Sequence, residues 1–229
     1  GMLLPDDYLK AVAAAVHAQG GLFVLDCIAS GTIWVDMQDI GVDVLVSAPQ
    51  KGWSGSPRAA FVMLSDAALA AMTGTTSTSF SCDLGKWLDI MRAYEGGAHA
   101  YHATMPTDAL RECRDVMDEA KAYGFDKLRD EQQALGDRVR EMLVDKGIQS
   151  VAAPGFEAPG VVVCYTDDAD ISNGSKFAAL GLQIAAGVPL QCDEPDGFRT
   201  FRLGLFGLDK LHNIERSVNS LEQALDQIL

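Results

Sequence analysis

The chain has 229 residues, of which 48% are hydrophobic and 22% are charged, a balance that is ordinary for a soluble globular protein of one or two domains. Its formal net charge of −14 argues against a nucleic-acid-binding or anionic-membrane surface, either of which needs clustered Lys and Arg. The five cysteines are widely spaced and no apolar run approaches a membrane span, so we expect reduced thiols, no metal site and a cytoplasmic location.

The first predicted element is a helix over Leu3–Gly20, with Pro5 in its first turn. Two short apolar runs follow, Leu22–Leu25 and Val42–Val46. Runs of this length bounded by glycine and proline are typical of interior strands of a parallel sheet. Because ligands collect at the carboxyl ends of such strands, the polar residues after each run are candidate site residues.

Asp26 closes the first run and Lys51 lies just beyond the second, in the sequences LDCIAS and SAPQK. Pyridoxal phosphate needs an acid against its ring nitrogen and a lysine amine that forms a Schiff base with its aldehyde. If the extended conformation continues past Asp26, Ile28 shares its face and packs against the flat ring. The alternative, on spacing alone, is a buried strand-end aspartate and an exposed loop lysine.

The acid of LDCIAS and the lysine of SAPQK are 25 positions apart, and together these phrases resemble the class V aminotransferases, in particular the alanine–glyoxylate and serine–pyruvate group. The resemblance implies that Asp26 is the ring-nitrogen partner, Lys51 the Schiff-base lysine and Gln50 a hydrogen-bond donor to the cofactor phosphate. The chain departs from many members at Pro49, where they have serine. The resemblance covers essentially the whole chain but only the C-terminal half, or slightly more, of a typical member.

After this loop, Ala59–Leu64 is predicted to be a strand at an antiparallel edge of the sheet, and Ser65–Met72 a short helix. A polar surface loop is predicted over Thr73–Ser81, followed by a second helix over Asp83–Met91. The stretch YEGGAHAYHATMPTDAL then gathers Tyr101, His102 and Thr104 in a loop. The resemblance implies that Tyr101 and Thr104 reach across a homodimer interface to the partner's cofactor phosphate. The alternative is a helix-capping loop with incidental polar residues.

The remaining pattern predicts two helices broken at Gly124 and then alternating strands and helices, which is a small α/β sandwich. The expected helices are Thr107–Tyr123, Asp126–Lys146, Ile171–Leu180 and Asp209–Leu229, and the expected strands are Ile148–Ala152, Val161–Tyr165, Leu182–Ala185 and Thr200–Leu205.

Arg202 lies in the last of these strands, within TFRLGLFG, where a lone guanidinium is costly unless it meets an anion. The resemblance implies that this arginine holds the substrate α-carboxylate with two parallel hydrogen bonds. The alternative is a salt-bridged strand arginine. Cysteine desulfurase chemistry is disfavoured, because the candidate nucleophile Cys192 is followed by Asp193 and Glu194, which raise a thiol pKa.

The resemblance therefore implies an α/β chain of the fold-type I, aspartate aminotransferase-like class, with a partial large domain (1–106), a linking helix (107–126) and a small C-terminal domain (127–229). The implied activity is amino transfer from a small amino acid of the alanine or serine type to a 2-oxo acid such as glyoxylate or pyruvate. Two alternatives remain: a truncated, non-catalytic relative that serves as a binding or assembly module, and one half of a split enzyme whose N-terminal half is encoded separately.

Overall fold

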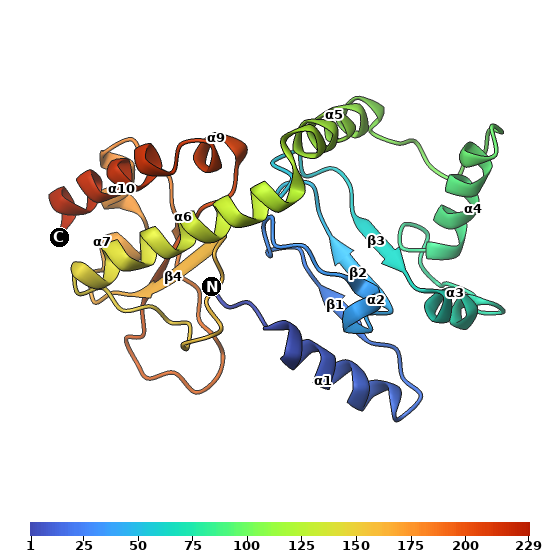
Figure 1. Cartoon of the computed structure of the whole chain (residues 1–229), viewed down its shortest axis with the longest axis horizontal. Coiled ribbons are helices and arrows are strands. Elements are labelled where there is room, and N and C mark those ends of the chain that lie inside the picture. Colours follow the sequence, from blue (N-terminus) through green and yellow to red (C-terminus); the bar gives the residue numbers. More distant parts are fainter.

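The computed structural model describes all 229 residues and places them in two layered halves joined by a long helix (Figure 1). The first half is built on a three-stranded sheet in the order β1 (Val24–Asp26), β2 (Val44–Ser47) and β3 (Phe61–Leu64). β1 and β2 are parallel, whereas β3 runs antiparallel to β2, which confirms the predicted antiparallel edge.

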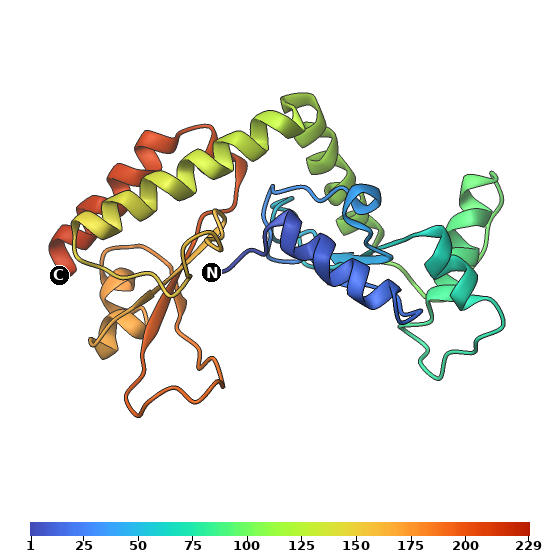
Figure 2. The ribbon, with the colours of Figure 1, turned by 60° about the horizontal axis from the view of Figure 1, so that its bottom comes forward.

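Helices α1 (Asp6–His17) and α2 (Met37–Ile40) pack on this sheet, and Figure 2 shows α1 running along it. The apolar stripe of α1 meets the inward-facing strand residues in a core cluster of Leu9, Ala13, Phe23, Ile40, Val42 and Leu45. The Asp36 carboxylate begins α2 by accepting hydrogen bonds from the backbone N–H groups of Gln38 and Asp39. This short helix was not predicted from the sequence.

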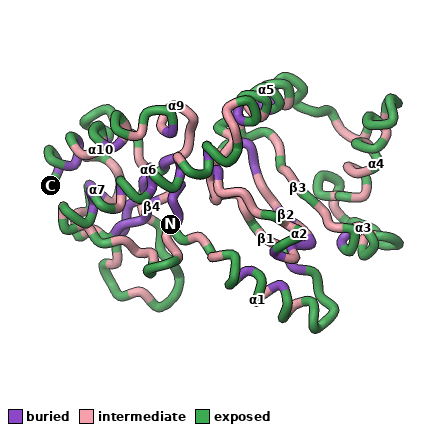
Figure 3. Tube along the Cα trace, viewed as in Figure 1, coloured by how far each residue is buried: buried purple, intermediate pink, exposed green.

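Three helices follow β3: α3 (Asp66–Met72), α4 (Leu84–Glu95) and α5 (Thr107–Tyr123). α3 begins at a serine cap, because the Ser65 hydroxyl accepts a hydrogen bond from Ala68 N. α4 has no buried residue and stands at the end of the molecule opposite the C-terminus (Figure 1). Figure 3 shows the same contrast in burial, with α4 largely exposed and the buried residues gathered along β2 and beneath α6.

The second half is organised by α6 (Phe125–Asp145), a helix that runs along this half and begins near the middle of the molecule (Figure 1). It packs on an antiparallel sheet in the order β4 (Val161–Tyr165), β6 (Thr200–Gly204), β5 (Ala185–Ala186). The surrounding helices are α7 (Ala169–Ser172), α8 (Ser175–Ala179), α9 (Leu208–Leu211) and α10 (Ile214–Ile228). Seventeen buried residues, from Ala120 to Ile228, form one core cluster here.

Several predicted boundaries are corrected. The segment Ile148–Ala152 is not a strand, because the Ser150 hydroxyl binds Arg140 and Ala152 N and leaves only a single bridge to Cys164. The helix predicted over Ile171–Leu180 is divided into α7 and α8 at Gly174, whose φ of 83° ends the first piece.

The other corrections shorten, shift or divide elements. The first helix begins at Asp6 because Pro5 is extended, the strand predicted at Leu182–Ala185 shrinks to β5, and the final helix is divided near Asn213. The first two strands each begin two residues after the start of the predicted apolar run, at Val24 instead of Leu22 and at Val44 instead of Val42. None of the helices combines the length and the apolar character that crossing a membrane requires.

Candidate active site

Asp26 lies beside the strand that leads to Lys51, at the carboxyl ends of the two parallel strands of the first sheet. Asp26 is the last residue of β1 and is paired in register with Val46 of the parallel strand β2. Its side chain is exposed and forms no ion pair, and only Oδ1 has a partner, the backbone N–H of Ile28 at 2.9 Å. Oδ2 of this carboxylate therefore remains available to accept a hydrogen bond from a ligand.

The hydrogen bond from Ile28 N corrects the expectation that the strand continues past Asp26. β1 ends at Asp26, and Ile28 lies in a turn that the aspartate side chain closes. Ile28 is half-buried beside Asp26, but it does not occupy the next outward position of an extended strand.

The loop that carries Lys51 is in direct contact with the loop that follows Asp26. A Cβ atom added to Gly52 would lie 2.2 Å from the carbonyl oxygen of Gly31, so only glycine fits at position 52. Lys51 is half-buried, and its Nζ forms no hydrogen bond or ion pair within the chain. Gln50 is exposed beside it. The structure thus joins the two loops whose polar residues the sequence singled out.

An aromatic cluster, which sequence reasoning missed, anchors both loops to the start of α6. Trp34 and Trp53 have ring centroids 5.2 Å apart, and Phe125 lies 5.2 Å from Trp34 and 6.1 Å from Trp53. The Trp34 indole N–H donates to the carbonyl oxygen of Phe125 at 3.0 Å. The available signal was that two of the chain's three tryptophans each follow one of the site strands.

Arg202 lies in β6, between Val163 of β4 and Ala185 of β5. Its Nε donates to the carbonyl oxygen of Ala186 at 2.8 Å, and it forms no ion pair with any of the chain's acids. Within the chain, the salt-bridged alternative therefore has no acidic partner for this arginine. The two terminal guanidinium nitrogens have no protein partner and have the fork geometry that binds a carboxylate through two parallel hydrogen bonds.

The segment that follows Arg202 contacts the loop that follows Asp26. A Cβ added to Gly31 would lie 3.0 Å from the Phe206 ring, and one added to Gly160 would lie 2.6 Å from it. The Phe206 ring is thus held between two glycines, one from each half of the chain. The structure brings together the surroundings of Asp26, Lys51 and the Arg202 strand.

Tyr101 and Thr104 lie apart, in the connection between α4 and α5. Their hydroxyl groups are 3.0 Å apart and hydrogen-bonded, and Tyr101 is 69% exposed. His102 hydrogen-bonds through Nε2 to the carbonyl oxygen of Phe80 at 2.9 Å and stacks on the Phe80 ring. No hydrogen bond or ion pair connects Tyr101 or Thr104 to Asp26, Lys51 or Arg202 within one chain.

The thiols of Cys27 and Cys192 form no ion pair or disulfide. Burial raises the pKa of the Cys27 thiol. Cys192 is exposed, and its backbone N–H and that of Gln191 donate to the Glu194 carboxylate, which lowers the pKa of Glu194 to about 2. Glu194 therefore serves to hold its own loop.

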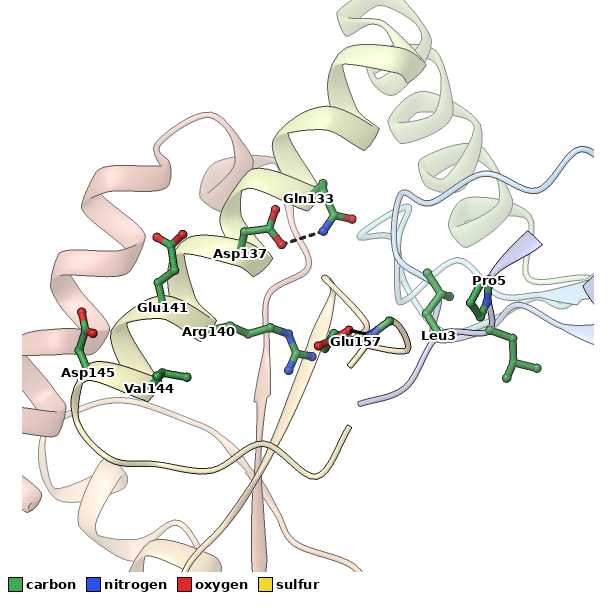
Figure 4. A pocket seen from close by; sticks show the side chains of 11 residues that line it. Leu3, Pro5, Gln133, Asp137, Arg140, Glu141, Val144, Asp145 and Glu157 are labelled. Carbon is green, nitrogen blue, oxygen red and sulfur yellow. Dashed lines mark hydrogen bonds between the residues drawn. The ribbon is translucent and has the colours of Figure 1, made fainter. Parts of the chain in front are cut away.

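A groove of about 880 Å³ between the N-terminal segment and α6 contains none of these residues (Figure 4). Its charged lining residues are Asp137, Arg140, Glu141, Asp145 and Glu157. Arg140 donates to Ser150 Oγ at 2.8 Å and to the Ala158 carbonyl oxygen at 2.9 Å, and burial lowers its pKa. These hydrogen bonds make Arg140 a structural residue of the small half.

No family model matches the chain. It is 27% identical over 237 residues to a 2-aminoethylphosphonate–pyruvate transaminase of Burkholderia ambifaria, covering 100% of this chain and 59% of that protein. It is 26% identical over 238 residues to an alanine–glyoxylate aminotransferase of Felis catus, covering 99% and 55% respectively. The chain thus spans little more than half the length of these relatives.

Among solved structures, the alanine–glyoxylate aminotransferase of Nostoc sp. superposes with a TM-score of 0.77 at 20% identity, over 95% of this chain and 57% of that one. At this identity the match establishes the fold alone. The fold is the C-terminal portion of the fold-type I, pyridoxal-phosphate-dependent aminotransferases, as predicted. Aminotransferases of this fold depend on pyridoxal 5′-phosphate.

Proposed function

We propose that this chain is the C-terminal part of a pyridoxal-phosphate-dependent aminotransferase that moves an amino group from a small donor, of the alanine or serine type, to a small 2-oxo acid. The observation that carries the proposal is the pairing of Asp26 and an unpartnered Lys51 after adjacent parallel strands, in loops that contact each other. The names of similar proteins support the acceptor, since they specify pyruvate or glyoxylate. In this proposal residues 1–106 are part of the cofactor-binding domain and residues 127–229 form the small domain. The helix over residues 107–126 links these two domains.

The residues present fit the cofactor. Asp26 Oδ2 is free to accept the N–H of a pyridinium ring, Lys51 Nζ is free to bond with an aldehyde carbon, and the exposed Gln50 amide is free to donate to a phosphate. Half-buried Ile28 offers an apolar surface beside Asp26. When bound, the cofactor supplies an electron sink for the carbon from which the donor loses its proton.

The roles of the protein side chains follow from their chemistry. The carboxylate of Asp26 keeps the proton on the ring nitrogen, because a nearby anion favours the protonated form. The Lys51 amine would hold the cofactor until the donor amine takes its place, and the freed Lys51 amine would then take the proton from the donor Cα as a general base. Arg202 binds the carboxylate of donor or acceptor with two parallel hydrogen bonds and so orients the reacting carbon toward Lys51.

We further propose that the enzyme is a homodimer in which Tyr101 and Thr104 of one copy donate to the cofactor phosphate of the other. Support comes from the surface around α4, which buries no residue of its own. Phe80, Met91, Tyr94 and Tyr101 are 67%, 60%, 56% and 69% exposed there, a concentration of aromatic and apolar surface that is typical of an interface.

The test is covalent trapping. Borohydride reduction of the chain with pyridoxal phosphate, followed by peptide mapping, is expected to label Lys51 saturably. Lys51→Arg should remove this label, whereas Lys86→Arg, which replaces an exposed lysine of α4, should not. Labelling spread over surface lysines, or unchanged by Lys51→Arg, would overturn the proposal.

A second candidate function is a non-catalytic binding or assembly module, alone or as one half of a split enzyme with a separately encoded N-terminal half. The observation in its favour is that β1 pairs on one side only and carries Val24, which is 58% exposed. A stable partner co-purifying from native extract, together with the absence of Lys51 labelling in the isolated chain, would favour this candidate.

A further inference from the structure

Helix α6 is the element that touches both halves of the proposed site. Its first turn carries Phe125, which packs on Trp34 and Trp53, and the next turn presents the Leu128 carbonyl oxygen, which accepts from Thr32 Oγ1 at 3.0 Å. These contacts fix the loops after β1 and β2. The following turn of the same helix carries Gln132.

Gln132 is fully buried, with an exposed fraction of 0%, yet it is a polar side chain in an apolar core. Its Nε2 donates to the carbonyl oxygens of Pro159 at 3.1 Å and Leu205 at 3.4 Å. These two acceptors determine the orientation of the amide, because the reverse orientation would set its oxygen against two carbonyl oxygens. Leu205 directly follows β6, the strand that carries Arg202.

The other atom of the amide faces the opposite half. Gln132 Oε1 has no hydrogen-bond partner, and a Cβ added to Gly31 would lie 3.2 Å from it. Gly31 is the residue against which Gly52, the neighbour of Lys51, is packed. One side chain therefore holds the end of the Arg202 strand and abuts the loop that supports Lys51.

The surroundings leave little room for adjustment. A Cβ on Gly136, one turn further along α6, would lie 2.6 Å from Pro159 Cα, so helix and loop backbones are in contact. Phe206, held between Gly31 and Gly160, follows Leu205 directly. A shift of the Leu205 carbonyl is therefore transmitted to Phe206 and to Gly31 rather than absorbed locally.

We infer that Gln132 is a positioning residue: by holding the Pro159 and Leu205 carbonyls while packing on Gly31, it fixes Arg202 relative to Lys51. The inference rests on the proposed function for its catalytic meaning and on geometry for its structural part. Gln132 acts through Arg202 and the Lys51 loop and does not itself touch the substrate. Its loss should impair carboxylate binding more than cofactor attachment.

The test compares Gln132→Met, which keeps length and helix propensity but removes the amide, with Gln133→Met, the same change at the exposed neighbouring position. In the holoenzyme we expect Gln132→Met to raise KM for both the amino donor and pyruvate about tenfold. Its kcat should stay within about threefold of the parent value, and saturable borohydride labelling of Lys51 should be retained. Gln133→Met should match the parent protein in all three.

Hydrogen–deuterium exchange provides a readout that does not depend on activity. Gln132→Met should increase amide exchange both in peptides covering residues 28–34 and in those covering 201–206. If Gln132→Met does not fold, Gln132→Leu, which also removes the amide but keeps an apolar side chain in the core, should produce the same paired increase.

Each outcome decides between the two proposals. Absence of Lys51 labelling in the parent protein would overturn the proposed function, while the paired exchange increase would still support the coupling by Gln132. Faster exchange confined to residues 159–160 and 205–206, or an unchanged KM in an active Gln132→Met enzyme, would overturn the positioning role.

Discussion

The two halves of the molecule are held together in different ways. The second half encloses one continuous core of 17 buried residues around α6 and the β4–β6–β5 sheet. The first half has a core cluster of only six, on the face of the sheet covered by α1 and α2, while Val24 and Met63 on its strands are 58% and 40% exposed.

Polar contacts make up part of this difference in the first half. Asp43 is buried and accepts hydrogen bonds from His17 Nε2 at 2.7 Å, from Phe23 N at 2.8 Å and from Ser65 Oγ at 3.0 Å. It thereby ties α1, the start of β1 and the beginning of α3 to β2. Apolar burial thus stabilises the second half, whereas a buried carboxylate organises the first.

The largest expected effect is in the continuous core. Phe177 is fully buried, and its ring centroid lies 5.9 Å from that of Phe201. Phe177→Ala should lower the free energy of unfolding of the second half by about 3 to 5 kcal/mol. Phe23→Ala, in the small cluster, should cost less because its surroundings have more freedom to collapse. Urea denaturation followed by circular dichroism measures both, and the reverse order would break the comparison.

The second largest expected effect concerns the buried carboxylate of Asp43. Asp43→Asn keeps the shape but loses the charge that accepts three hydrogen bonds, and it should destabilise the first half by about 2 to 4 kcal/mol. Asp39→Asn is the matched control, because Asp39 forms only an exposed ion pair with Lys10 and should matter little. If the two substitutions lowered the free energy of unfolding equally, Asp43 would not organise the first half.

The pH dependence of stability sharpens the same point. Hydrogen bonds from Phe23 N, His17 and Ser65 outweigh the effect of burial and hold the pKa of Asp43 below its ordinary value of 3.8. A carboxyl whose pKa is lower in the folded state stabilises the fold above pH 3.8, and this stabilisation is lost as the pH falls through the folded value. Protection of the amides in residues 9–26, relative to their intrinsic exchange rates, should therefore fall more steeply in acid than protection in residues 201–205, and Asp43→Asn should abolish that difference.

The sequence predicted the two strands that precede Asp26 and Lys51 and the antiparallel β3, because apolar runs and the polar residues that end them are local signals, but β1 is an edge strand and not the interior strand expected. It did not predict the turn at Ile28, since that depends on the hydrogen bond to Asp26 Oδ1. The predicted strand at Ile148–Ala152 was wrong because pairing with β4 is limited to a single bridge at Ser150, whose hydroxyl accepts the hydrogen bond from Ala152 N.

The tryptophan cluster and Gln132 were also beyond local reasoning. Trp34, Trp53 and Phe125 are distant in sequence, and their rings meet because the first turn of α6 lies against the loops after β1 and β2. Gln132 lies on the same face of α6 as Leu128 and Leu135, so helical spacing could have placed it in the core, but its partners, the Pro159 and Leu205 carbonyls, depend on the fold.

The smallest predicted effect concerns a helix cap in the first half. Ser65→Ala removes the hydroxyl that accepts from Ala68 N at 3.2 Å and donates to Asp43, and it should cost about 1 kcal/mol. Ser77→Ala, in the exposed loop after α3, provides the control. A larger loss than that of Asp43→Asn would contradict the ranking of these contacts.

The central claim is that the two differently stabilised halves share one site, with Lys51 in one and Arg202 in the other. Its most direct test is calorimetric titration of the cofactor-loaded protein with pyruvate, comparing Arg202→Lys with Arg199→Lys, a nearby arginine exposed to solvent. We predict that Arg202→Lys weakens pyruvate binding about tenfold while Lys51 labelling is unchanged, because lysine cannot form the two parallel hydrogen bonds. Equal pyruvate affinity in both variants and the parent protein would contradict the shared site.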